Sequence, residues 1–243
     1  MRTKTLVLTA LSSLSAIGLM AQTSTNVYSL NAVGYINVAV PQGFSIIADQ
    51  LWANTSGSNA IGQVLVAPQD GSLDGSKLYK FSGAKYHIYT MDSGIADSWD
   101  PIASGPDADA DPGAHVTLNP GEGAFFLSAA PATFTFVGTV PQGTNSIPLH
   151  AGFNLISSAV PQAGGVTSTL GFPIDFSAAG SQDGDKLYTF DHTAGYHIYT
   201  VDSGDASGWQ SGQEPHVLVG QGFFYLTTAS GPSSWTRVFS VNQ

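Results

Sequence analysis

Two Asp-Ser-Gly triplets are the residues of this sequence best suited to chemistry. Asp92-Ser93-Gly94 and Asp202-Ser203-Gly204 each follow an apolar, aromatic run containing "YHIYT". Two carboxylates brought together share a proton, because like charges about 3 Å apart cannot both ionise, and the pair then acts as acid and base on a water molecule. The triplets therefore admit a hydrolase in which Asp92 and Asp202 are the catalytic pair.

The context of the triplets favours a different role. Aspartic proteases look similar, with one such triplet in each of two all-β lobes, but they usually place a small or hydroxyl residue after the glycine. Here Ile95 and Asp205 follow. Asp-Ser-Gly is also ordinary turn chemistry, in which the carboxylate accepts backbone N–H bonds. We favour the turn, and keep an aspartic-protease-like hydrolase as an alternative.

The segment "DADAD" is the second candidate site. Asp107, Asp109 and Asp111 alternate, as in calcium loops where every second residue offers an oxygen to a hard cation. An EF-hand would place Gly at the sixth position and Glu at the twelfth, but Pro112 and Leu118 stand there. The pattern therefore admits calcium as a cofactor or describes a solvated acidic loop. Repeated histidines leave a transition-metal site open as well: His87, His197, His115 and His216.

Aromatic side chains supply the third candidate. Trp99 and Trp209 stand in polar, glycine-flanked segments, and Tyr89 and Tyr199 precede them. Exposed aromatic rings beside Asp, Asn and Gln suit stacking on sugar rings, which makes these four residues candidate glycan ligands. The alternative, which we favour for the tryptophans, is that each closes the end of a small core over its hairpin.

Composition restricts the partners and the chemistry. The chain of 243 residues has 7 basic and 17 acidic residues and a net charge of −10, so nucleic acid is a disfavoured partner. It has no cysteine, which excludes disulfides and thiolate catalysis. Charged residues make up only 10% of the chain, which favours self-association or attachment to a surface.

The first residues have the layout of a secretory signal peptide. Arg2 and Lys4 precede an uncharged apolar run from Leu6 to Met20, and Ala21 offers a small residue near the cleavage point. We therefore expect residues 1–21 to be removed and the mature chain to be secreted or held at the cell surface. No other long apolar run follows, so we expect no transmembrane segment in the mature chain.

A duplication organises the rest of the sequence. "DGSKLYKF" at 74–81 matches "DGDKLYTF" at 183–190, and "GEGAFFL" at 121–127 matches "GQGFFYL" at 220–226. Matches in the same order over the whole length indicate two homologous repeats. We assign a lead-in at 22–34, a first repeat at 35–142 with an acidic insertion at 100–114, and a second repeat at 143–243.

Each repeat reads as short strands rich in aromatic and β-branched residues between Gly, Pro, Asn, Asp and Ser. The predicted strands of the first repeat are 43–48, 77–81, 86–91, 124–127 and 134–140, with Ser82–Lys85 as a hairpin loop. One helical turn is predicted at 58–65, capped by Ser58 or Asn59. The fold class is all-β, with each repeat a small sandwich or partly open barrel.

The pattern resembles a group of exported tandem-repeat proteins of Verrucomicrobia and related bacteria. The likeness rests on Asn31–Val38, on the strand 152–157 with its "GFNLIS", and on Gly121–Phe126. It covers nearly the whole mature chain and implies fold and export, without an activity. We therefore expect a secreted or cell-surface structural or binding protein without catalytic activity. Its expected partners are other copies of itself or an extracellular polysaccharide, and glycan binding through Trp and Tyr is the first alternative.

Overall fold

The computed structural model describes residues 32–174, 182–227 and 233–241. The predicted signal peptide and nearly all of the predicted lead-in lie outside these ranges. Asn31–Gln243 forms one compact unit. No helix in the described part of the chain is long and apolar enough to cross a membrane.

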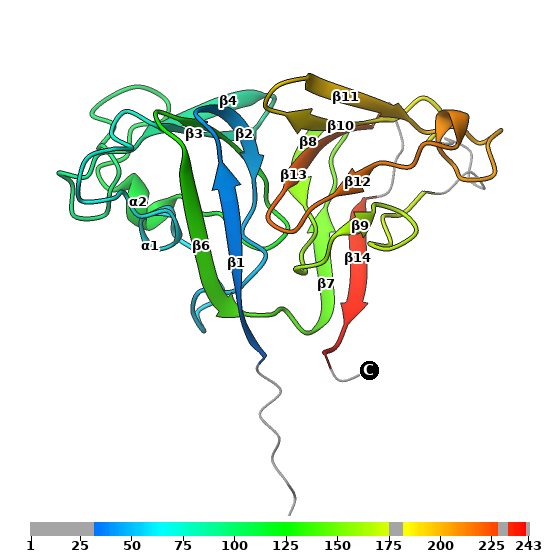
Figure 1. The fold of residues 1–243 in the computed structure, drawn as a ribbon, viewed down its shortest axis with the longest axis horizontal. Coiled ribbons are helices and arrows are strands. Elements are labelled where there is room, and N and C mark those ends of the chain that lie inside the picture. Colours follow the sequence, from blue (N-terminus) through cyan, green and yellow to red (C-terminus); the bar gives the residue numbers. More distant parts are fainter. Residues whose placement is uncertain (1–31, 175–181, 228–232, 242–243) are drawn as a thin grey trace, which may run out of the picture. The chain divides into compact units, whose positions relative to one another are not determined.

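The fold is all-β, as predicted, and both repeats use the same six principal strands (Figure 1). Repeat 1 contains β1 (Val33–Val40), β2 (Gly43–Ile47), β3 (Lys77–Ser82), β4 (Lys85–Thr90), β5 (Ala124–Ser128) and β6 (Ala132–Thr139). Repeat 2 contains β7 (Gly143–Pro148), β8 (Gly152–Ser157), β10 (Lys186–Asp191), β11 (Gly195–Thr200), β13 (Gly222–Thr227) and β14 (Ser234–Phe239). The short strands β9 (Gly164–Gly165) and β12 (His216–Val217) pair with each other in repeat 2.

Each repeat is a sandwich of a four-stranded and a two-stranded antiparallel sheet. Repeat 1 has the order β2-β5-β3-β4 in the larger sheet and pairs β1 with β6. Repeat 2 has the corresponding order β8-β13-β10-β11 and pairs β7 with β14. The first and last strands of each repeat thus pair across its whole length, which places the start of repeat 1 at Val33, inside the predicted lead-in. Neither repeat is a closed barrel.

The core of each repeat lies between its two sheets. In repeat 1, Ile36 and Phe136 from the two-stranded sheet pack with Leu78 and Phe126 from the four-stranded sheet, and Trp99 packs beside them. The four strand residues point inward because side chains alternate between the two faces of a strand. Trp99 lies in the segment that follows β4 and also points into the core. The corresponding core of repeat 2 contains Ile147, Leu187, Val201, Trp209, Phe223, Tyr225 and Trp235.

The remaining described elements are short helical turns. They are α1 (Ile61–Val64), α2 (Pro112–His115) and the 3-10 turn Gln210–Gly212. The predicted cap of α1 is wrong, because Ala60 is the N-cap residue and no side chain caps the helix. Asn59 is instead fully buried, and its Nδ2 donates to the Asp49 carboxylate and to the Leu51 carbonyl. Asn59, which precedes the helix, therefore bonds to buried partners in the core instead of capping the helix.

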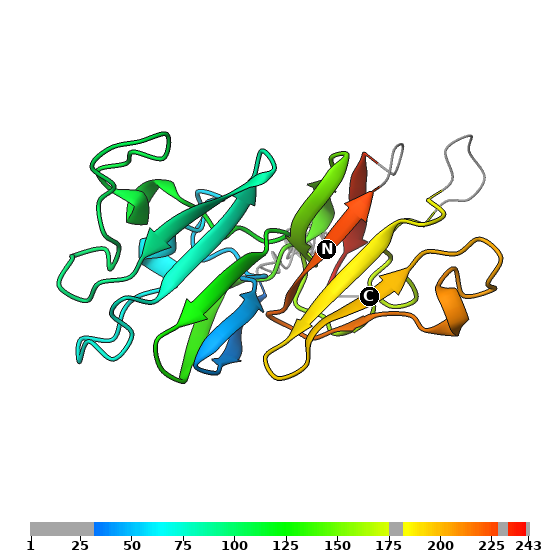
Figure 2. The same cartoon turned by 90° about the horizontal axis from the view of Figure 1, so that it is seen from above.

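Backbone hydrogen bonds join the two repeats in a twofold-related pattern. The Ala48 N–H donates to the Gly220 carbonyl at 2.9 Å, and the Ser157 N–H donates to the Gly121 carbonyl at 2.9 Å. Ala48 and Ser157 follow or end corresponding strands, and Gly121 and Gly220 open the duplicated "GEG" and "GQG" segments. The two four-stranded sheets are therefore connected at their β2 and β8 sides, which leaves β4 and β11 as the outer strands (Figure 2).

Candidate functional site

The two Asp-Ser-Gly triplets form separate turns. The Asp92 carboxylate accepts the Gly94 N–H at 2.7 Å, and the Asp202 carboxylate accepts the Gly204 N–H at 2.8 Å. In Figure 1 the segment joining β4 to α2 lies on the left, whereas β11 ends on the right. Within the described residues no hydrogen bond links Asp92 to Asp202. The carboxylates thus have the geometry of the favoured turn interpretation, and a shared-proton pair stays a prediction without a contact to support it.

A second aspartate in each repeat holds the triplet in place. Asp74 accepts the Ser93 N–H at 2.7 Å and the Ser93 hydroxyl at 3.0 Å. Asp183 makes the same two bonds to Ser203, at 2.5 and 2.6 Å. Asp74 and Asp183 open the duplicated "DGSKLY" and "DGDKLY" segments. In each repeat this segment therefore binds the Asp-Ser-Gly triplet that follows later in the chain, which explains why the two motifs are duplicated together. Charge-assisted bonds to a backbone N–H fix the exit of each hairpin.

Both tryptophans are completely buried, as the favoured interpretation of the sequence predicts, so they do not present exposed indoles to a glycan. Trp99 and Trp209 each have an exposed fraction of 0%. They pair by an antiparallel bridge with the residues that follow β4 and β11, Met91 and Val201, and close the core over each hairpin. A sugar ring cannot reach them without opening the sandwich. Tyr89 and Tyr199, the other predicted glycan ligands, are half-buried against the same cores.

The three alternating aspartates engage different partners. Asp107 accepts from His87 Nδ1 at 2.6 Å and lies 3.5 Å from Lys85 Nζ. Burial raises the pKa of its carboxyl, but the contacts with His87 and Lys85 together bring that pKa below its usual value.

The other two aspartates also accept hydrogen bonds from neighbouring groups. Asp109 accepts the Asp111 N–H and a bond from His115 Nδ1 at 2.8 Å, and both bonds lower its pKa. Asp111 accepts the Ala114 N–H at the start of α2. Across the described ranges no group of three or more His, Asp or Glu side chains is arranged to hold a metal. Calcium binding therefore stays a prediction, checked by melting the protein in calcium and in chelator.

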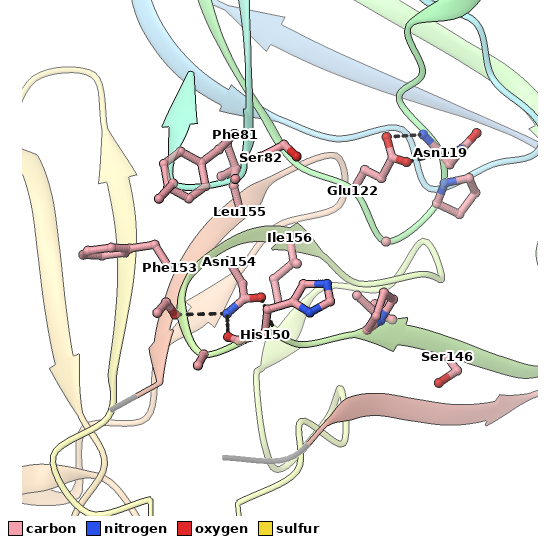
Figure 3. A pocket seen from close by; sticks show the side chains of 18 of the residues that line it. Phe81, Ser82, Asn119, Glu122, Ser146, His150, Phe153, Asn154, Leu155 and Ile156 are labelled. Carbon is pink, nitrogen blue, oxygen red and sulfur yellow. Dashed lines mark hydrogen bonds between the residues drawn. The ribbon is translucent and has the colours of Figure 1, made fainter. Parts of the chain in front are cut away.

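A cavity lies between the repeats, and no motif of the sequence predicts it. Its volume is about 1040 Å³. The β3–β4 loop of repeat 1 and the start of β8 in repeat 2 face each other across it (Figure 3). Its lining combines aromatic rings with polar side chains, including Trp52, Phe81, Asn119, Glu122, His150 and Phe153. Residues this far apart in the sequence could be brought together only by the contact between repeats, which no local pattern predicts.

A difference in loop length distinguishes this side of the interface from its twofold-related side. The β10–β11 loop of repeat 2 is one residue longer than the β3–β4 loop of repeat 1. Its His192 ring lies 3.2 Å from the position that a Cβ would take at Gly43, at the start of β2. At Gly152, the corresponding start of β8, a Cβ would meet nothing within 4 Å. The shorter loop of repeat 1 therefore leaves space beside β8 where repeat 2 places a histidine beside β2.

Glu122 is the fixed charge of the cavity. Its carboxylate accepts from Lys80 Nζ at 2.6 Å, from the Asn119 Nδ2 at 3.1 Å and from the Thr117 hydroxyl at 3.2 Å. The side chain keeps 35% of its surface exposed, so an oxygen can still meet a ligand. Repeat 2 has Gln221 at the matching position, whose Oε1 accepts the Leu218 N–H. The charge is thus particular to repeat 1, on the side where the space is open.

Two aromatic rings and a satisfied amide complete the wall. Phe153 is 47% exposed and packs edge-on against Phe224, at 5.9 Å between ring centroids. Phe81 packs against the same ring at 5.7 Å. Asn154 is held by the His150 backbone on both sides, since its Oδ1 accepts the N–H at 2.8 Å and its Nδ2 donates to the carbonyl at 2.7 Å (Figure 3). These bonds fix the loop that carries Phe153, so the ring is presented by a rigid frame.

Comparison with known proteins finds no match for this chain. No protein-family model matches the chain, and no curated protein or solved structure matches it either. The resemblance to exported tandem-repeat proteins therefore stays a prediction.

Proposed function

We propose that the protein is an exported, non-catalytic binding protein whose cavity between the repeats takes a neutral carbohydrate. The observation that carries this proposal is the combination, in one cavity of about 1040 Å³, of a half-exposed Phe153 ring with the fixed carboxylate of Glu122. A sugar has apolar faces that stack on aromatic rings and hydroxyl groups that bond carboxylates and amides. Binding sites commonly pair apolar walls with a few placed polar groups in this way.

The charge of the chain selects a neutral ligand. With a net charge of −10 and a carboxylate in the cavity, the protein repels uronic-acid and sulfated polymers. Neutral hydroxyls can instead donate to Glu122 and accept from Asn119. The glycan alternative drawn from the sequence is thus kept as a proposal, with its site moved from the buried tryptophans to the cavity.

The cavity favours binding over hydrolysis. Glycosidases of the usual kind need two carboxyl groups on either side of the scissile bond. Among the residues lining this cavity, Glu122 is the single acidic one. Its carboxylate already accepts hydrogen bonds from Lys80, Asn119 and Thr117.

Calorimetric titration with cellohexaose, laminarihexaose, chitohexaose and an acidic oligogalacturonate tests the proposal. We expect one of the neutral hexaoses to bind and the galacturonate not to bind. Phe153→Ala should weaken binding about tenfold, which corresponds to 1.4 kcal/mol of lost contact. Glu122→Gln, which installs the residue that repeat 2 uses, should weaken it to a similar extent.

The duplication supplies the matched control. Phe44 occupies in β2 the position that Phe153 occupies in β8, is 41% exposed, and lies outside the cavity lining. Phe44→Ala should leave the affinity unchanged. Equal losses of affinity in Phe44→Ala and Phe153→Ala would contradict the assignment of the cavity. So would the absence of binding to every neutral hexaose.

A further inference from the structure

The outer faces of the two four-stranded sheets form an apolar surface, which we call the aromatic face and which shares Phe153 with the cavity lining. Alternation along the strands points aromatic and aliphatic side chains away from the two cores. Six of them have between 41% and 58% of their surface exposed: Phe44, Tyr86 and Ile88 from repeat 1, and Phe153, Tyr196 and Ile198 from repeat 2. This spacing repeats in both halves, so the surface is a duplicated feature of the fold.

The centre of the aromatic face is already an interface. Ile46, Phe125, Leu155 and Phe224 are buried there by contact between the repeats. Across that contact the Phe125 and Phe190 rings lie 5.5 Å apart, and the Phe81 and Phe224 rings lie 5.7 Å apart. The exposed residues flank this buried centre without a break. Each repeat therefore covers part of its aromatic face with the same face of its homologue.

The strands of the face present no outward carboxylate that would repel a second acidic copy. The only charged side chains that alternation places there, on the eight strands of these sheets, are Lys77 and Lys186. Two chains of net charge −10 repel one another over most of their surface, but they present no strand carboxylate to each other here. The outer strands β4 and β11 carry the same "YHIYT" segment, so the two ends of the face are alike. A like surface related by twofold symmetry is what an isologous dimer requires.

We propose that the exposed flanks of the aromatic face bind the aromatic face of a second copy of this chain, giving a twofold dimer. The contact repeats between chains the ring-on-ring packing that already holds the two repeats together. It buries the half-exposed Ile88 on β4 and Ile198 on β11.

Light scattering after size exclusion, over a dilution series of the chain from Gln22 onward, tests this dimer. The chain contains the whole compact unit of Asn31–Gln243. We expect twice the monomer mass at high loading and the monomer mass on dilution. The double variant Ile88→Lys/Ile198→Lys should stay monomeric throughout. The matched control is Val137→Lys/Val238→Lys, on β6 and β14, where the exposed fractions are 57% and 68%.

Two results would overturn the proposal. One is a parent chain that stays monomeric at every loading, as a face reserved for another kind of partner would give. The other is a control variant that dissociates as readily as the Ile88/Ile198 variant. Because the lysines could disturb folding, hydrogen exchange on the parent provides a second readout. Amides of β4 and β11 should be protected more strongly at high protein concentration than at low protein concentration. Protection that does not change with concentration would also contradict the dimer.

Discussion

Phe125 and Phe224 hold corresponding positions in β5 and β13 and pack against each other across the contact between the repeats. Their ring centroids lie 5.7 Å apart with the ring planes inclined at 44°, and both side chains are buried. A residue that meets its own duplicate marks the local twofold axis. The two repeats are thus halves of one cooperative unit, because each supplies the ring that buries the other.

This relationship predicts coupled losses of stability. Phe125→Ala and Phe224→Ala should each lower the free energy of unfolding by about 3 to 5 kcal/mol, the usual range for a buried phenylalanine. The double variant should lose about 1 kcal/mol less than the sum, since the second truncation removes a contact that is already gone. Urea unfolding measures all three. Strict additivity would mean that the rings do not stabilise one another.

The duplicated Gly-x-Gly segments predict a second test. Gly121 has a φ of +97°, and a Cβ there would lie 2.7 Å from Ile147 Cγ1. Gly105 has a nearly equal φ of +103°, but a Cβ there would meet nothing within 4 Å. Gly105→Ala should therefore cost only the backbone strain, about 1 to 2 kcal/mol. Gly121→Ala adds a clash beside the contact between repeats and should cost clearly more in the same denaturation experiment.

Equal effects of the two glycine substitutions would show that close approach is not the reason for glycine at 121. A further control is available in repeat 2. Gly220, the counterpart of Gly121, has a φ of +77° and would bring a Cβ against Val38. Gly220→Ala should therefore resemble Gly121→Ala rather than Gly105→Ala.

The two buried tryptophans give a matched pair with one difference. Trp209 Nε1 donates to the Thr167 hydroxyl at 2.9 Å. Trp99 Nε1 is buried and has no hydrogen-bond partner among the described residues. Trp209→Phe should lower the melting temperature more than Trp99→Phe, by the equivalent of about 1 kcal/mol, because it also removes a hydrogen bond. The cavity left by the smaller ring is common to both variants. A larger loss at Trp99 would contradict this reasoning.

The sequence predicts the strands and the duplication well, because both depend on local chemistry. Alternation and turn residues locate β3 and β4 to within one residue, but the loop between them is Gly83–Ala84, because Ser82 and Lys85, predicted as loop residues, pair as the last positions of the two strands. The candidate site is harder to predict from the sequence. Phe81 and Phe153 belong to different repeats, and their meeting depends on how the two sandwiches pack. Burial of Trp99, by contrast, agrees with the favoured interpretation of the sequence, because a small repeat without cysteine needs large apolar residues to close its core.

Asp49 also shows what a local pattern misses, and it supports a prediction about pH. Its side chain is 1% exposed, and burial raises its pKa from 3.8 to about 7, against the lowering effect of bonds from the Leu51 N–H and Asn59. Between these two values the folded protein holds a proton that the unfolded chain has released. The free energy of unfolding therefore falls as the pH rises from about 4 to about 7.

Repeat 2 indicates the substitution that tests this effect. Ser158 occupies the position of Asp49, and its hydroxyl accepts the Val160 N–H at 3.2 Å, as Asp49 accepts the Leu51 N–H. Asp49→Ser keeps that bond and removes the ionising group. The melting temperature of the variant relative to the parent should therefore rise steadily between pH 4 and pH 7 and level off above pH 7.

An exposed aspartate provides a control of opposite sign. Hydrogen bonds from Ser72 lower the pKa of Asp70, so its contribution to stability is present above its unfolded pKa and is lost as the solution is acidified. Asp70→Ser should consequently lose stability relative to the parent as the pH rises through the acidic range, whereas Asp49→Ser gains. Differential scanning calorimetry at half-unit pH steps resolves the two trends. Parallel curves for Asp49→Ser and its parent would show that Asp49 ionises as freely in the folded protein as in the unfolded chain.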